Sequence, residues 1–209
     1  MFELAVTINK EFILVVEGKC DFKVFASFGK YLGINLSLQI IWVDGEIDCP
    51  KLNAIINLPN FENKVKALGV IRDADDNPAG VFQSTIAIFD NLNLPQPSQP
   101  GSFANNSQVK TGIFIMPGDE EKGELETLIV KALENKYTER FQCVNSYLSC
   151  MQSKGVNIRK IAKAKIHSFI GGSEKPELIL GEAALAGYWN WDDVVFEGIK
   201  GFLLSLTTA

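Results

Sequence analysis

Short apolar runs rich in β-branched residues alternate with segments of helical periodicity through the first part of the chain. The apolar runs predict strands at residues 12–16, 36–43, 66–72 and 112–116. Apolar positions at helical spacing predict helices at residues 21–32, 51–58 and 81–92. Strands that alternate with helices are typical of an α/β fold with a mostly parallel sheet. An additional edge strand at residues 3–7 also fits the pattern.

The pattern changes after Pro117, where helical periodicity replaces the alternation of strands and helices. Helices are expected at residues 125–133, 137–151 and 158–170, and from about 192 to 206. A stretch rich in turn-forming residues at 94–108 precedes the fourth strand. We therefore expect a Rossmann-like α/β core of four or more strands at residues 1–117, and a mostly helical extension at residues 118–209 packed on it.

Length, apolar content and cysteine spacing indicate a cytoplasmic protein without disulfides or a zinc site. The 209 residues suffice for one sizeable domain, or for a domain with an appendage. The N-terminus lacks the features of a signal peptide, and no apolar run is long enough to span a bilayer, so we expect a cytoplasmic protein with no membrane partner. Four scattered cysteines without a C-x-x-C pair, beside His167 as the one histidine, favour structural thiols over a zinc site.

Charge is distributed unevenly along the chain. The net charge of −5 argues against nonspecific coating of nucleic acid, yet no acidic residue occurs from Arg140 to Ser173. Within this segment, Arg159, Lys160 and Lys163 can share one side of a helix. They are candidates for phosphate contacts, and a solvated helix face is the alternative interpretation.

Carboxylates follow two of the predicted strands. Glu17 comes directly after the first strand, and Asp73 and Asp75 come after the third. Parallel strands end at a common edge of the sheet, where α/β proteins bind ligands, so these three side chains are expected in one crevice. Three carboxylates need a neutralising cation, and hard oxygen ligands favour Mg²⁺ or Mn²⁺.

These two stretches together resemble the metal-binding motifs of the Toprim superfamily, which includes topoisomerase and primase domains, small RNA-maturing ribonucleases and OLD-family nucleases. The stretches are Val15-Val-Glu-Gly-Lys-Cys-Asp21 and Val70-Ile-Arg-Asp-Ala-Asp-Asp-Asn-Pro-Ala-Gly80. Further along, Gly123-Glu-Leu-Glu-Thr-Leu and Gly187-Tyr-Trp-Asn-Trp-Asp-Asp look like a small, poorly characterised Toprim-related family of bacteria and archaea. The resemblance implies a Toprim-like fold and phosphoryl transfer that depends on Mg²⁺.

The resemblance also implies roles for individual residues. Glu17 would act as general acid or base, and Asp73 and Asp75 would hold the metal, with Glu17 as a further ligand. Asp21 would support these ligands from the first turn of the next helix. Glu124 and Glu126 resemble the acids that bind a second metal in OLD-type nucleases, although acids at a helix start also have a purely structural explanation. Gly18 and Lys19 would contact phosphate, and for Lys19 a surface position is the alternative.

Two functions follow from this reading, and they leave open whether the chain is an enzyme. The first is a small Toprim-type nuclease, a phosphodiesterase that cleaves nucleic acid with Mg²⁺ or Mn²⁺. The second is a noncatalytic regulatory module that binds a nucleotide or nucleic acid, as a homo-oligomer or within a larger complex. Asp-x-Asp phosphatases rank lower, because their motif follows the first strand rather than the third and has a Thr or Val where Asn77 stands here. Glycosyltransferases with strand-Asp-x-Asp motifs also rank lower, because they do not explain Glu17 and Gly18.

Overall fold

The computed structural model describes residues 7–106, 108–119 and 121–208. Within these residues, five strands form one sheet in the order β2-β1-β3-β5-β4. The strands are β1 (Phe12–Val16), β2 (Leu38–Trp42), β3 (Ala67–Asp73), β4 (Phe103–Asn105) and β5 (Lys110–Met116). Neighbouring strands run parallel except for β4, which pairs with β5 in the antiparallel direction. The predicted α/β fold with a mostly parallel sheet is confirmed.

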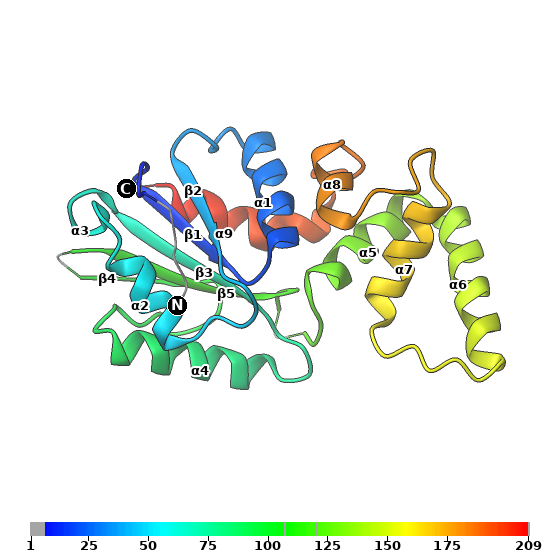
Figure 1. Cartoon of the computed structure of the whole chain (residues 1–209), viewed down its shortest axis with the longest axis horizontal. Coiled ribbons are helices and arrows are strands. Elements are labelled where there is room, and N and C mark those ends of the chain that lie inside the picture. The colour runs from blue at the N-terminus through cyan, green and yellow to red at the C-terminus, as the bar shows by residue number, and fades with distance from the viewer. Residues whose placement is uncertain (1–6, 107, 120, 209) are drawn as a thin grey trace.

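Helices cover both faces of this sheet (Figure 1). One face carries α1 (Lys19–Tyr31) and α9 (Glu197–Leu206), and the other carries α2 (Cys49–Ile56) and α4 (Pro78–Asn91). Side chains alternate between the two faces along each strand, so each strand supplies both cores. In β1, for example, Leu14 and Val16 pack on the α1 side, whereas Ile13 and Val15 pack on the side of α2 and α4.

The last helix, α9, packs directly on the centre of the sheet. Gly69 on β3 lies opposite Gly112 on β5. A Cβ atom at Gly69 would be 2.7 Å from Leu206 Cδ2, and one at Gly112 would be 2.9 Å from Phe202 Cε2. The two glycines therefore leave the space that the side chains of α9 fill.

Between β5 and α9 the chain forms a helical lobe beside the sheet (Figure 1). We define the lobe by its three helices, α5 (Leu125–Lys136), α6 (Thr138–Ser153) and α7 (Ile161–Gly171). The shorter α8 (Leu180–Leu185) packs against α1, where Ser27 Oγ donates a hydrogen bond of 2.8 Å to the Ala184 carbonyl. The part of the chain after β5 thus contributes both the lobe and, through α9, a layer of the sheet.

The structure adds elements that periodicity did not reveal. These are α3 (Phe61–Lys64), α8, a 3₁₀ turn at Val194–Phe196, and β4 within the turn-rich stretch. Phe103 of β4 stacks on Phe202 of α9 at 4.9 Å between ring centroids, which fixes this short strand at the sheet edge. The edge strand expected at residues 3–7 lies outside the described residues apart from Thr7. No helix in the described ranges combines the length and apolarity needed to cross a membrane.

Candidate functional site

The two strands that carry the predicted motifs are neighbours in the sheet. Strands β1 and β3 run parallel with Val15 opposite Val70, so Glu17 and Asp73 arrive at the same edge. From β1 the chain moves first to β2 and then crosses to β3 on the other side. The edge between β1 and β3 is therefore the point where the strand order reverses, which is where open α/β sheets bind ligands.

Glu17 is held by Arg72, a residue that sequence analysis did not single out. The Arg72 Nε donates to Glu17 Oε1 at 3.0 Å, and its Nη2 donates to Glu46 Oε1. Its Nη1 donates to Ser84 Oγ at 3.1 Å and to Thr85 Oγ1 at 3.3 Å. The Arg72 side chain is 4% exposed, so a buried guanidinium is satisfied on all three nitrogens by this group.

Alternation along β3 places Arg72 and Asp73 on opposite sides of the sheet. Val70 packs in the core on the side of α2 and α4, and Arg72 shares this side because it lies two residues further along. Ile71 packs in the core on the α1 side, which Asp73 shares. The presence of Val15 in the same core as Val70 explains why Glu17 meets Arg72. The sequence offered one sign of this role, because Arg72 closes the apolar run of a predicted buried strand, directly before Asp73.

Asp73 lies among other carboxylates near the start of α1 and α5. Its Oδ1 accepts a hydrogen bond of 3.0 Å from the Leu125 backbone N–H. Burial, together with the negative charges of Asp21, Glu126 and Glu17, raises the pKa of Asp73 to about 8. Burial and Glu126 likewise raise the pKa of Asp21 to about 6, and burial raises the pKa of Glu126. The structure therefore brings Asp73 together with Asp21 and Glu126, with Glu17 at the border of the group.

A small cavity lies between these carboxylates. It encloses about 10 Å³ and is bordered by Glu17, Asp21, Asp73 and Arg72 together with apolar side chains such as Met116. A volume of this size holds about one water molecule or one small ion.

Asp75 was expected beside Asp73, but it adopts a different position. Its backbone φ is +46°, and it exchanges two hydrogen bonds of 2.8 Å with the backbone of Gly123. This turn leaves the Asp75 side chain 62% exposed, where its Oδ1 accepts a hydrogen bond of 2.6 Å from Lys160 Nζ. In this structure the metal set predicted from the motif is therefore not assembled around Asp75.

The downstream acids and the basic helix predicted to bind phosphate contact one another. Lys160 Nζ lies 3.2 Å from Glu124 Oε2, and Lys163 Nζ lies 3.4 Å from the same oxygen. Lys163 Nζ also lies 3.5 Å from Glu126 Oε1. Glu124 is the N-cap residue of α5 and forms a capping box with Thr127, which is the structural role weighed for it.

The other residues predicted to contact phosphate are at the starts of α1 and α7. Gly18 is the N-cap of α1, and Lys19 is its exposed first residue. Arg159 is exposed in the loop before α7, next to Lys160. His167 belongs to α7, as expected for an ordinary helix residue.

The donor set around Asp73 suits a hard divalent cation. Three carboxylates from β3, α1 and α5 converge there, and oxygen ligands are those that Mg²⁺ and Mn²⁺ prefer. As the side chains stand, no group of three or more acidic, histidine or cysteine side chains in the described ranges has the geometry to hold a metal ion. A cation would therefore have to draw these carboxylates closer together, which their mutual repulsion otherwise opposes.

A doubly wound sheet defines a Rossmann-like α/β domain, and the acids at its switch point mark a candidate ligand site at that edge. The chain belongs to the DUF3226 family, described as a protein of unknown function, whose model matches residues 11–208. The fold is similar to the crystal structure of the hypothetical protein PH0156 from Pyrococcus horikoshii OT3, with a TM-score of 0.54 and 14% identity over 95% of this chain and 94% of that chain. A search of curated proteins found no match. These findings make no assignment to the Toprim superfamily.

Proposed function

We propose that the protein catalyses phosphoryl transfer on nucleic acid with Mg²⁺ or Mn²⁺, as a small nuclease of Toprim type. The observation that carries this proposal is the group of partly buried carboxylates around Asp73 at the switch point. Partly buried acidic side chains that lie close together destabilise a folded protein unless cations or protons neutralise them. Arg72 lines the same cavity and Lys163 lies 3.5 Å from Glu126, but neither forms an ion pair with Asp73 or Asp21 within the described ranges. A site retained at this cost is typical of a functional centre.

In this proposal Asp73 holds the cation with help from Asp21 and Glu126. When bound, such an ion lowers the pKa of a water molecule and neutralises charge on a phosphodiester oxygen. Glu17 borders the same cavity and is fixed by Arg72, so its carboxylate has the defined position that proton transfer requires. Asp75 and Glu124 would join the site only after leaving Lys160.

Lys160, the N-cap of α7, and Lys163 in its first turn give the proposal a source of positive charge. Lys160 and Lys163 contact acids at the border of the carboxylate group. If a divalent cation takes over those acids, the lysine ammonium groups become available to a phosphate at the same edge of the sheet. Both lysines are about half exposed, which allows such an exchange of partners.

The test is a cleavage assay joined to a binding assay on the same samples. Purified protein is treated with EDTA, supplied with Mn²⁺ or Mg²⁺, and incubated with labelled DNA and RNA in single-stranded and duplex form. Asp73→Asn should abolish cleavage and the rise in melting temperature that Mn²⁺ causes. Asp76→Asn is the matched control, because Asp76 is an exposed acid three residues further along the chain. Cleavage that survives Asp73→Asn would refute the proposal.

The second candidate is a noncatalytic module that binds a nucleotide or nucleic acid. The pairing of Asp75 with Lys160 and of Glu17 with Arg72 favours it, because these acids are then engaged in ion pairs. This alternative predicts that neither metal produces cleavage of any of the four substrates, while the protein still retains one of them in a binding assay.

A further inference from the structure

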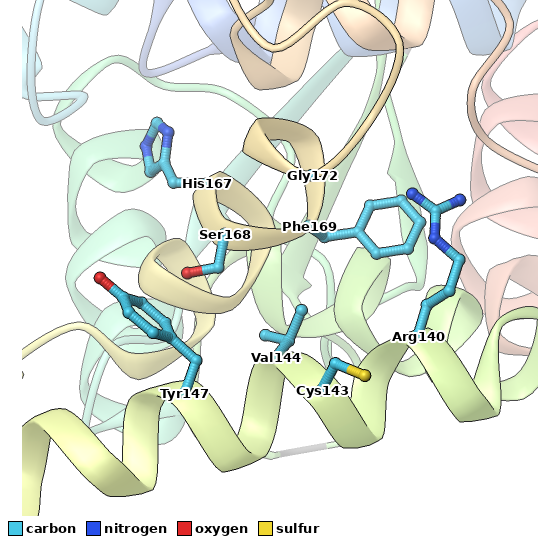
Figure 2. A pocket seen from close by; sticks show the side chains of 8 residues that line it. All are labelled: Arg140, Cys143, Val144, Tyr147, His167, Ser168, Phe169 and Gly172. Carbon is cyan, nitrogen blue, oxygen red and sulfur yellow. The ribbon is translucent and has the colours of Figure 1, made fainter.

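The helical lobe contains a cavity away from the carboxylates. It lies between α6 and α7 and encloses about 700 Å³, a size typical of sites for small molecules or single nucleotides. Figure 2 shows the side chains that line it: Arg140, Cys143, Val144, Tyr147, His167, Ser168, Phe169 and Gly172. The lining is mostly apolar, with polar groups at its two ends.

Arg140 marks one end of this cavity as a site for an anion. Its guanidinium lies 4.4 Å from the centre of the Phe169 ring and 5.3 Å from that of Tyr137. Stacking on two rings holds the planar group in place while its N–H edge stays available. Across the described ranges, no carboxylate lies within ion-pair distance of Arg140.

An exposed aromatic side chain marks the other end. Tyr147 is 54% exposed and lies seven residues after Arg140 on the same helix. Seven residues are close to two helical turns, so both side chains are on one face of α6, separated by about 10 Å along its axis. In Figure 2 both face the α7 side of the cavity. A planar ring at this position is suited to stacking with a base.

Charge complementarity favours a polyanion over a basic or neutral partner. The cavity lies within the segment from Arg140 to Ser173, which has six lysine and arginine residues and no acid. A second hollow of about 510 Å³ shares Arg140, Phe169 and Gly172 with the first and extends past Glu174, the one acid in its lining, to Tyr188. The two adjoining hollows, which we call the groove, both border the stacked Arg140 and fit a chain of nucleotides better than a single one.

Helix α7 connects this groove to the carboxylates. The helix begins after Lys160 and has Lys163 in its first turn, and both lysines contact Glu124. Its second half lines the cavity through His167 and Phe169. The distance from Lys160 to Phe169 along the helix is about 13 Å. A strand bound in the groove can therefore extend along α7 to the carboxylate edge.

We propose that the groove between α6 and α7 binds single-stranded nucleic acid, with a phosphate on Arg140 and a base against Tyr147. This inference rests on the proposed function, for which it specifies the form of the substrate. A single strand is required because base pairing in a duplex hides the faces of the bases from an aromatic side chain.

The experiment measures binding in EDTA, so that it does not depend on catalysis. Fluorescence anisotropy is recorded with labelled dT₁₂, rU₁₂ and a 12-base-pair duplex DNA at several salt concentrations. Arg140→Gln should weaken single-strand binding about tenfold and reduce the dependence on salt. Tyr147→Ala should weaken it at least about fivefold. Lys154→Gln, an exposed lysine of the same segment outside the groove, should change it less than about twofold.

Several outcomes would overturn the inference. These are the absence of single-strand binding, equal binding of the duplex, and wild-type affinity in both groove variants. If Tyr147→Ala alters the oligomeric state in light scattering and leaves binding unchanged, the groove is an interface between copies and the inference is wrong.

The results also distinguish the groove from the proposed nuclease activity. Single-strand binding that Arg140→Gln weakens, without cleavage in Mn²⁺, would support the groove and refute the nuclease. Cleavage in Mn²⁺ with wild-type binding by both variants would support the nuclease and refute the groove. The relative affinities for dT₁₂ and rU₁₂ show which nucleic acid is preferred.

Discussion

At the end of β3, the charged side chains on the two faces of the sheet have opposite surroundings. On one side, which we call balanced because each carboxylate has a cationic partner, the buried Arg72 pairs with Glu17 and the exposed Glu46 and has a hydrogen-bond partner on each guanidinium nitrogen. On the other side, Asp73 lies among acids that raise its pKa. A charge-balanced buried group is explained by stability and positioning, whereas an unbalanced one calls for a ligand. The comparison shows that adjacent charged residues in one motif serve different purposes when alternation separates them.

The largest effect is expected from breaking the balanced side. Arg72→Met leaves Glu17 and the hydroxyl groups of α4 without their donor, and should lower the free energy of unfolding by about 3–5 kcal/mol. Urea denaturation followed by circular dichroism measures this change. Lys66→Met is the control, because Lys66 forms an exposed pair with Glu11 and its loss should cost less than about 1 kcal/mol. Equal effects of the two variants would show that the buried group does not contribute specially to stability.

The unbalanced side should make stability depend on pH when EDTA removes metal. The folded protein retains the proton on Asp73 up to about pH 8, whereas the unfolded chain releases it near pH 4. Between these values the folded state binds more protons, so the free energy of unfolding falls as pH rises. Asp21 acts in the same direction up to about pH 6. Because of these groups, the free energy of unfolding measured by urea denaturation should be more than about 2 kcal/mol lower at pH 8 than at pH 5. A rise in stability with pH would contradict the prediction.

Replacing the unbalanced charge should stabilise the protein without metal. Asp73→Asn removes a carboxylate whose ionisation the site disfavours, and the amide oxygen can still accept the hydrogen bond from Leu125. At pH 8 in EDTA the variant should gain about 2 kcal/mol over wild type, and the gain should shrink toward pH 5. Thermal unfolding at both pH values measures this difference. A loss of stability at pH 8 would mean that the carboxylate contributes to the fold.

The smallest effect is expected at the exposed ion pairs between the lobe and the carboxylate group. Lys160→Gln removes contacts with Asp75 and Glu124 and should lower stability by about 0.5 kcal/mol in low salt, and by less in high salt. Denaturation curves at two ionic strengths provide the measurement. A loss as large as that of Arg72→Met would show that Lys160 is a structural residue, and would weaken its proposed role as a cation that changes partners.

Much of the fold could be predicted from periodicity, because apolar patterning is a local property of the chain. The strands β1, β2, β3 and β5 were all predicted, and so were the helices that cover the sheet and the three helices of the lobe. Short elements were missed. Strand β4 has three residues and owes its position to the contact between Phe103 and Phe202, which no local pattern encodes.

For the site, the sequence alone determined that Glu17 and Asp73 end neighbouring strands at one edge, because buried parallel strands and their carboxyl ends follow from residue pattern. Tertiary structure decided the partners of each acid. Arg72 engages Glu17, and the turn at Asp75 directs that side chain to Lys160, 85 residues away in the chain. Charges interact across space rather than along the sequence, so only the packing of α1, α5 and α7 around the sheet could show which carboxylates are balanced and which are not.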